Sequence, residues 1–90
     1  MKPIRWTLHA MQNLLDREIE RTEVDKTLAQ PEFIAPGQFP RHIHMRRYFD
    51  SLLQQEMLLR LVIEETIGET VVVSVYKTSQ IDRYLRGLVP

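Results

Sequence analysis

The chain contains no cysteine, which excludes disulfide bonds, thiolate zinc sites and a cysteine nucleophile. This absence fits a reducing compartment, and we expect a cytoplasmic location. Long apolar runs are also lacking: the longest, residues 57–63, is broken by Arg60 and is too short to cross a bilayer. Residues 1–10 hold no apolar run of signal-peptide length. We therefore expect no membrane partner.

The sequence has no excess of charge of either sign, because 12 basic and 12 acidic side chains cancel. A uniformly basic nucleic-acid-binding protein is therefore not expected, and anion binding would need a local cluster. The three glycines form no phosphate-cradling loop, and no serine lies in a nucleophile elbow. The composition that remains is ordinary for a globular protein. It predicts a single domain over residues 1–90.

Apolar residues recur at helical spacing early in the chain and predict a helix over residues 8–19, capped by Thr7. The apolar stripe would consist of Leu8, Met11, Leu15 and Ile19, with Leu14 widening it. A second helix would begin at Thr22 and end before Pro31, because proline conflicts with the preceding helical turn. Ahead of both helices, Ile4 and Trp6 could form a short strand or pack on the first helix as a staple.

After residue 40 the apolar period changes to two, which predicts strands over residues 41–49, 57–64 and 70–76. A three-residue loop would join the last two, with Gly68 in the left-handed conformation. That register sets Glu65 opposite Glu69.

The same register sets Arg60 opposite Ser74 and Leu58 opposite Tyr76. It leaves one sheet face wholly apolar for the helices to cover and one mixed face for function. The last residues, 79–90, could form a short helix or fray. The fold class is α+β, with two N-terminal helices packed on a small, mainly antiparallel sheet of three to four strands.

Three polar residues on the first helix, His9, Asn13 and Arg17, are spaced by four and share one side of it. A histidine can transfer a proton near neutral pH, and an arginine can hold a phosphate with two hydrogen bonds. This combination suits phosphodiester cleavage. It is equally compatible with a solvated helix face.

A basic cluster precedes Tyr48 and consists of Arg41, His42, His44, Arg46 and Arg47. Cations beside an aromatic ring suit a single-stranded nucleic acid. The alternative is a charged edge strand that discourages aggregation. His42 and His44 share a strand face and could hold a metal, but no third ligand is evident, so we expect neither a metal nor another cofactor.

Hydroxyl groups and a lysine gather at the end of the last predicted strand, at Ser74, Tyr76, Lys77, Thr78 and Ser79. Such groups could contact phosphate, or they could be ordinary strand and turn residues.

Several short segments, taken in their order, resemble the bacterial family known as domain of unknown function 4258. The similar segments are WTLHAMQNLLDREI, VDKTLAQPE, LLRLVIEE and VVVSVYKTSQIDRYL. The shared features are His9-Ala10, Arg17 and Ile19, Pro31-Glu32, and Val75-Tyr76. The resemblance covers roughly residues 4–84. The chain departs from the family pattern at Asn13, where many members have arginine, and at Ser74, where threonine is more frequent.

This family is thought to resemble the barnase–colicin–RelE-like ribonucleases, which include many toxins of toxin–antitoxin pairs. The resemblance implies metal-independent RNA cleavage through attack by a 2′-hydroxyl group, with RNA and an antitoxin as partners. The residues expected to act in catalysis are His9, Arg17, Ser74 and Tyr76. The residues expected to bind substrate are Asn13, Arg46, Arg60 and Lys77. The alternatives are a non-catalytic protein-interaction module and an inactive relative of that fold.

Overall fold

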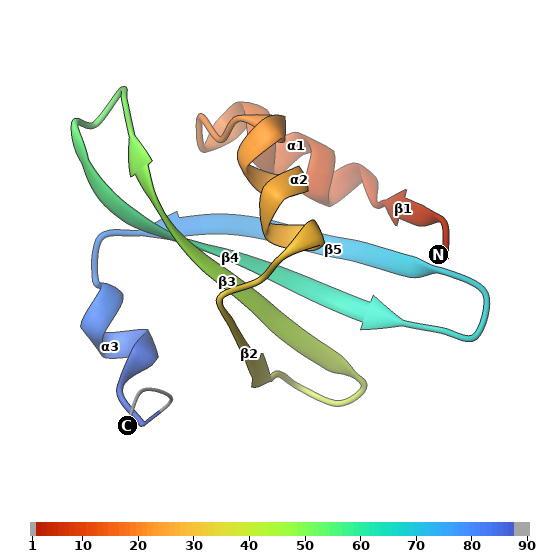
Figure 1. Cartoon of the computed structure of the whole chain (residues 1–90). Coiled ribbons are helices and arrows are strands. Elements are labelled where there is room, and N and C mark those ends of the chain that lie inside the picture. Colours follow the sequence, from red (N-terminus) through yellow and green to blue (C-terminus); the bar gives the residue numbers. More distant parts are fainter. Residues whose placement is uncertain (1, 88–90) are drawn as a thin grey trace.

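A computed structural model describes residues 2–87 of the chain. It contains five strands and three helices (Figure 1). In chain order they are β1 (Ile4–Trp6), α1 (Leu8–Asp16), α2 (Arg21–Ala29), β2 (Phe33–Pro36), β3 (Arg41–Asp50), β4 (Gln55–Glu65), β5 (Thr70–Thr78) and α3 (Ile81–Leu85). The predicted α+β class is confirmed.

The five strands form one sheet in the order β1-β5-β4-β3-β2. All neighbours are antiparallel except β1 and β5, which are parallel. The sheet is therefore larger than the expected three to four strands, and it is mixed. The two strands not firmly predicted lie at its edges. β1 has only three residues, and β2 has four and ends at Pro36, so neither sequence shows a clear alternation of apolar and polar residues.

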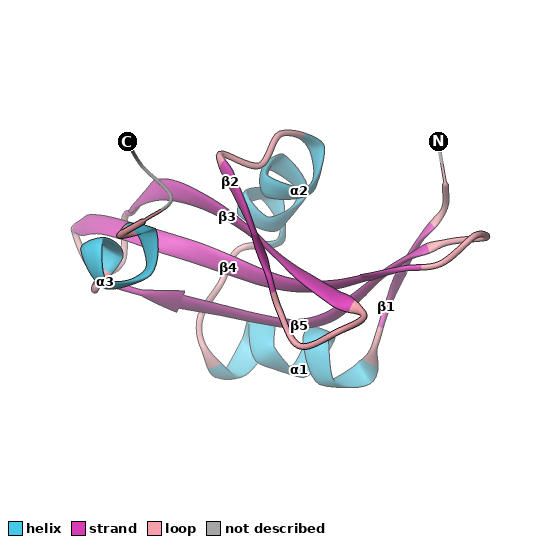
Figure 2. Ribbon diagram, turned by 90° about the horizontal axis from the view of Figure 1, so that it is seen from below, coloured by secondary structure: helices cyan, strands magenta, loops and turns pink. Residues whose placement is uncertain are grey.

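Both faces of the sheet are covered by helices. In Figure 1, α1 and α2 lie above the sheet and α3 lies below it, and Figure 2 shows the same division from below. The larger core cluster lies under α1 and α2 and contains Ala10, Ile19, Val24, Leu59, Leu61, Ile63, Val72 and Val75. The smaller cluster lies between the sheet and α3 and contains Met45, Leu58 and Leu85. The mixed face is thus partly covered by the terminal helix, which was one of the two alternatives for this segment. Leu88, which shares its apolar spacing, lies outside the described residues.

The predicted core stripe of the first helix is wrong at three of its five residues, whereas Leu14 and Ile19 do pack in the larger core cluster. Leu8 is 86% exposed, Leu15 is 77% exposed and Met11 is 49% exposed. The helix instead buries Ala10 and Asn13. The reason is its position, because α1 packs along the free edge of β5 and meets it through hydrogen bonds rather than through an apolar stripe.

Four hydrogen bonds join the first helix and its cap to that edge. The Thr7 amide donates to the Val72 carbonyl at 3.1 Å, and the Thr7 hydroxyl donates to the Val73 carbonyl at 2.9 Å. The Asn13 Oδ1 atom accepts from the Val75 amide at 3.0 Å, and an Arg17 guanidinium nitrogen donates to the Val75 carbonyl at 2.8 Å. The unpaired backbone of an edge strand is satisfied in this way.

Two helix boundaries differ from the prediction. The first helix ends at Asp16, because Arg17 leaves the helical conformation and Glu18 takes a left-handed one, with φ of 52°. The buried Ile19 therefore belongs to the connection. The second helix begins at Arg21 after an N-cap at Glu20, two residues before the expected Thr22 cap. Its end before Pro31 agrees with the prediction.

The turn between β4 and β5 also differs, because it has four residues, 66–69, rather than three. The Thr66 hydroxyl accepts a hydrogen bond from the Glu69 amide and closes the turn, and Gly68 has no positive φ. The register accordingly pairs Glu65 with Thr70.

An irregularity between Val62 and Ile63 shifts the pairing by one more residue, so Arg60 lies opposite Tyr76 rather than Ser74. The longer turn and this irregularity each move the pairing by one residue. Together they move it by two, so side chains beyond the irregularity point to the faces that were predicted. Arg60, Ser74 and Tyr76 therefore stay on the predicted mixed face.

Candidate functional site

Two arginines from different elements meet at one tyrosine of β5. The Arg17 guanidinium, at the end of α1, lies 6.0 Å from the centre of the Tyr76 ring. The Arg60 guanidinium, from β4, lies 5.0 Å from the same centre and donates a hydrogen bond to the Tyr76 hydroxyl. Because Arg17 lies at the strand edge and Arg60 on the sheet face, the tyrosine is approached from two directions.

The terminal helix adds a second ring and a third arginine. The Tyr84 ring centre lies 3.9 Å from the Arg60 guanidinium, and the Arg83 guanidinium lies 5.7 Å from the same ring. We call these five residues the Arg–Tyr cluster: Arg17, Arg60, Tyr76, Arg83 and Tyr84. Cations within about 6 Å of an aromatic ring centre are attracted to the ring.

Local structure explains each of these positions. The β4–β5 register sets Arg60 directly opposite Tyr76. The contact of α1 with the β5 edge brings Arg17 to the Val75 carbonyl, one residue before this tyrosine. The apolar side of α3 packs into the small core cluster through Leu85, which positions Tyr84.

The neutral net charge of the chain conceals an uneven distribution of charge. Eight of the 12 basic side chains form ion pairs with carboxylates, and these are Lys2, Arg5, Arg21, Lys26, Arg41, Arg46, Arg47 and Lys77. The other four, Arg17, Arg60, Arg83 and Arg86, have no carboxylate partner among residues 2–87. Three of these four belong to the Arg–Tyr cluster.

The most unusual member is Arg60, which is only 9% exposed. Besides the Tyr76 hydroxyl, its hydrogen-bond partner is the thioether sulfur of Met45, at 3.4 Å. Arginine is almost never buried without a compensating charge, because removing a guanidinium from water is costly. Aromatic faces and a sulfur compensate it only in part. This environment favours an anion as an additional partner.

Two of the predicted catalytic residues, His9 and Ser74, take no part in these contacts. His9 is exposed and lies one helical turn before Asn13. Ser74 is half-buried, two residues before Tyr76 and on the same sheet face. Among the described residues, neither side chain has a hydrogen-bond partner or an ion pair. Both are therefore available to a ligand.

The other predicted substrate-binding residues have internal partners. Asn13 is 4% exposed, and its Oδ1 atom holds the Val75 amide. Arg46 binds the Glu23 carboxylate and the Thr27 hydroxyl of α2. These contacts connect helices to the sheet, and the structure does not bring these two residues together with Arg60.

Lys77 lies across the sheet from the cluster. Its Nζ atom lies 2.7 Å from an Asp50 carboxylate oxygen and 3.0 Å from the Glu18 carbonyl oxygen. The hydrogen bond from Lys77 holds the pKa of Asp50 below its usual value. Burial, with the neighbouring Asp50 carboxylate, raises the pKa of Tyr48, so this phenol stays protonated at neutral pH.

The basic segment of β3 is largely neutralised. Arg41 pairs with Glu64 and Arg47 pairs with Glu32, whose pKa is lowered by this hydrogen bond. Burial lowers the pKa of His44, and its Nδ1 atom is buried without a hydrogen-bond partner. In the part of the chain that the structure describes, no three histidine or acidic side chains are grouped as a metal site.

Sequence reasoning did not identify Arg83 and Tyr84 as functional residues. The helical spacing of Tyr84 with Ile81 and Leu85 indicated only a core position. The ring does pack in the core, but it also covers Arg60. No local pattern predicts this contact, because it joins residues 24 positions apart through tertiary packing.

Comparison with protein-family models, with curated proteins and with solved structures found no match to this chain. The resemblance to domain of unknown function 4258 therefore stays a prediction. Within residues 2–87, no helix has the length and apolar character needed to cross a membrane.

Proposed function

We propose that this protein is a small ribonuclease that binds single-stranded RNA at the Arg–Tyr cluster and cleaves it without a metal ion. The observation that carries the proposal is the unpaired, largely buried Arg60 beside two tyrosine rings and two further unpaired arginines. Guanidinium groups bind phosphate, and aromatic rings stack on unpaired bases. A single-stranded polyanion satisfies both kinds of group.

The β5 edge supplies groups suited to each part of RNA cleavage. His9 would take the proton of the ribose 2′-hydroxyl, whose oxygen then attacks the adjacent phosphorus. The bond from phosphorus to the 5′-oxygen breaks, and that oxygen takes a proton from solvent. Arg17 and Arg60 would bind the phosphate as its negative charge grows. Tyr76 and Ser74 would orient the substrate through their hydroxyl groups.

The proposal is tested with fluorescently labelled single-stranded RNA of mixed sequence, incubated with purified protein and excess chelator. Wild-type protein should cleave the RNA. His9→Ala should bind equally well and cleave about a hundredfold more slowly or worse, since general acid–base catalysis contributes at least this factor. His9 is exposed, so the variant should fold normally. Cleavage by His9→Ala at the wild-type rate would rule out the assigned proton transfer.

Binding is tested separately by fluorescence anisotropy with Arg17→Ala. We expect affinity to fall about tenfold, because a charge-assisted hydrogen bond contributes roughly 1.5–3 kcal/mol. Arg5→Ala is the matched control, because this exposed arginine pairs with Glu69 away from the cluster. Equal affinity of the two variants would contradict RNA binding at the cluster. Because the Arg17 side chain also contacts the Val75 carbonyl, the melting temperature of each variant should be compared.

A further inference from the structure

The first helix presents an apolar ridge to solvent, formed by Leu8, Met11 and Leu15. Their spacing of three and four puts them on one side of the helix, with the two leucines 86% and 77% exposed. Helical geometry places Asn13 and Arg17 on the opposite side, against β5. The ridge is therefore separate from the Arg–Tyr cluster. Contiguous exposed apolar side chains with a polar border are typical of protein interaction sites.

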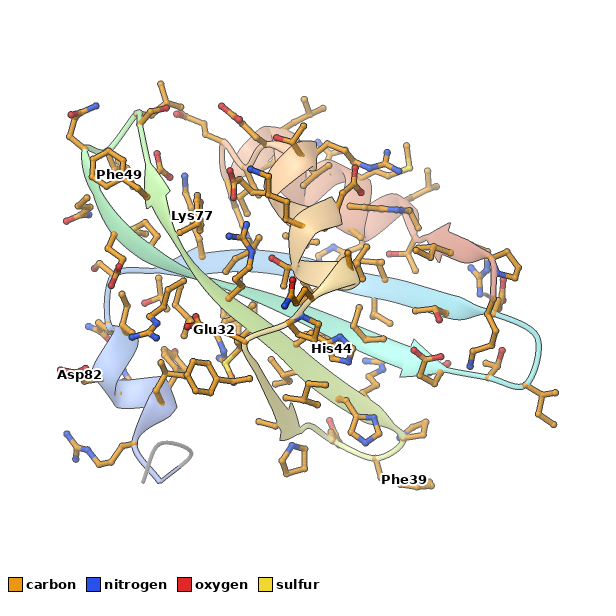
Figure 3. All side chains as sticks on the ribbon, viewed as in Figure 1. Glu32, Phe39, His44, Phe49, Lys77 and Asp82 are labelled. Carbon is orange, nitrogen blue, oxygen red and sulfur yellow. The ribbon has the colours of Figure 1, made fainter. Side chains whose placement is uncertain are left out.

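An acidic pocket lies beyond the C-terminal end of this ridge. The Glu18 amide donates to the Leu15 carbonyl at 3.4 Å, so the backbone of Glu18, which borders the pocket, lies next to that of the last ridge residue. The pocket, of about 80 Å³, is bordered by Glu18 and Glu20 on one side and by Phe49 and Leu52 on the other. Figure 3 shows Phe49 at the end of the sheet where β3 turns into β4. The Phe49 and Leu52 side chains are largely exposed, so apolar surface continues past the acids.

The charge of this pocket is net negative. Of its four carboxylates, Glu23 is neutralised by Arg46 and Asp50 by Lys77. Glu18 and Glu20 have no cationic partner among the described residues.

Lys26 shares Glu23 with Arg46 and so offsets one of these two charges in part, which leaves the pocket net negative. Arg21 pairs with Asp25 and covers the Trp6 ring, and Arg17 is directed to Tyr76. Asp16, at the end of α1, adds another carboxylate without a cationic partner in the described part of the chain.

We propose that the ridge and the pocket together bind a basic amphipathic helix of a partner protein. The apolar side of that helix packs on Leu8, Met11 and Leu15. One lysine or arginine of the partner enters the pocket between the two glutamates, with its cation against the Phe49 ring. The proposal does not depend on ribonuclease activity.

Charge selects this occupant over two others. Two copies of the chain meeting through the ridge with their first helices parallel would bring Glu18 and Glu20 of both copies together, which repels them. An anionic lipid surface would meet the same carboxylates and be repelled as well. A basic helix gains from both the apolar ridge and the acidic pocket.

The test uses a synthetic helical peptide with leucines on one face and lysines flanking them, and a matched peptide with glutamates in place of the lysines. Binding to the full chain is measured by calorimetry. The lysine peptide should bind, and the glutamate peptide should bind at least tenfold more weakly. Equal binding of the two peptides, or binding of neither, would overturn the proposal.

Three variants locate the binding surface. Leu8→Gln/Leu15→Gln should weaken binding of the lysine peptide at least tenfold, and Glu18→Gln/Glu20→Gln should weaken it and reduce its salt dependence. Ile67→Gln is the matched control, because this residue is fully exposed on the distant β4–β5 turn. All of these side chains are exposed, so the variants should melt like wild type.

Loss of binding in Ile67→Gln equal to that of the ridge variant would overturn the proposal. So would a concentration-dependent dimer in sedimentation that the ridge variant abolishes, because a second copy would then occupy the ridge. Sedimentation with anionic vesicles that depends on the same two leucines would likewise assign the surface to lipid.

Discussion

Single side chains join distant parts of this molecule through buried charges. Asp50 accepts hydrogen bonds from the amides of Leu52 and Leu53, which form the β3–β4 turn, and from the Tyr48 hydroxyl. Its fourth partner is Lys77 from β5, whose side chain is only 11% exposed. A buried carboxylate with this many donors organises the turn, and the lysine balances its charge.

Lys77→Met should destabilise the protein by about 3 kcal/mol at neutral pH, because it leaves the Asp50 carboxylate buried without a cation. The folded-state pKa of Asp50 lies below the unfolded value. Its stabilising contribution is therefore complete above the unfolded pKa and is lost as pH falls through the folded pKa. The difference in unfolding free energy between wild type and Lys77→Met should accordingly become smaller in acid.

Urea unfolding of both proteins at pH 7 and near pH 3 measures this difference. The control is Lys26→Met, whose ammonium group forms an exposed ion pair with Glu23 at 3.7 Å. That variant should change stability by less than about 1 kcal/mol. If Lys77→Met lowered the unfolding free energy equally at both pH values, the lost stability would come from packing rather than from charge.

At the scale of secondary structure, the position of α1 is the decisive feature. This helix closes the edge of β5 with side-chain hydrogen bonds and leaves its apolar stripe exposed. The same arrangement places Asn13 and Arg17 against the strand, with the exposed His9 one helical turn before Asn13. Both the candidate RNA site and the apolar ridge result from the packing of α1 against β5.

Asn13→Ala should weaken the attachment of α1, because the Val75 amide loses its acceptor in a buried place. We expect a loss of about 2 kcal/mol in the free energy of unfolding, and faster hydrogen exchange of the Val75 amide. Gln12→Ala, on the exposed side of the same helix, controls for the change in side chain. Unchanged protection of the Val75 amide would contradict the role assigned to Asn13.

For the whole molecule, the separation of unpaired charges matters more than the net charge. Unpaired arginines gather around Tyr76 and Tyr84, whereas three of the five carboxylates without an ion pair among the described residues, Asp16, Glu18 and Glu20, lie at the end of α1 and just after it. The other two are Glu56 and Asp82. A neutral protein can in this way offer an anion-binding surface and a cation-binding surface at once.

The affinity for single-stranded RNA should fall with added salt. With three arginines neutralising phosphates, log K should fall against log salt concentration with a slope of about −2. Arg17→Ala should make this slope shallower by roughly 0.7. Anisotropy titrations at several salt concentrations measure the slope for wild type and for the variant. An unchanged slope in this variant would contradict a phosphate contact at Arg17, whatever the absolute affinity.

The sequence by itself was sufficient for the regular elements whose patterns are local. Alternating Val, Ile and Leu predicted β4 and β5, and Pro31 marked the end of α2. The polar spacing also put Asn13 and Arg17 together, and both contact the backbone of Val75. The mixed sheet face was also correct, because two shifts in register cancelled.

Only the tertiary structure decided which of these groups act together. Apolar spacing shows that α1 has an apolar side, but that side faces solvent here because the polar side satisfies the β5 edge. Ion pairs form between residues far apart in the chain, so the sequence could not separate the neutralised Arg46 and Lys77 from the unpaired Arg17 and Arg60. Hydrophobic periodicity is encoded locally, whereas the partner of a charge is set by packing over long range.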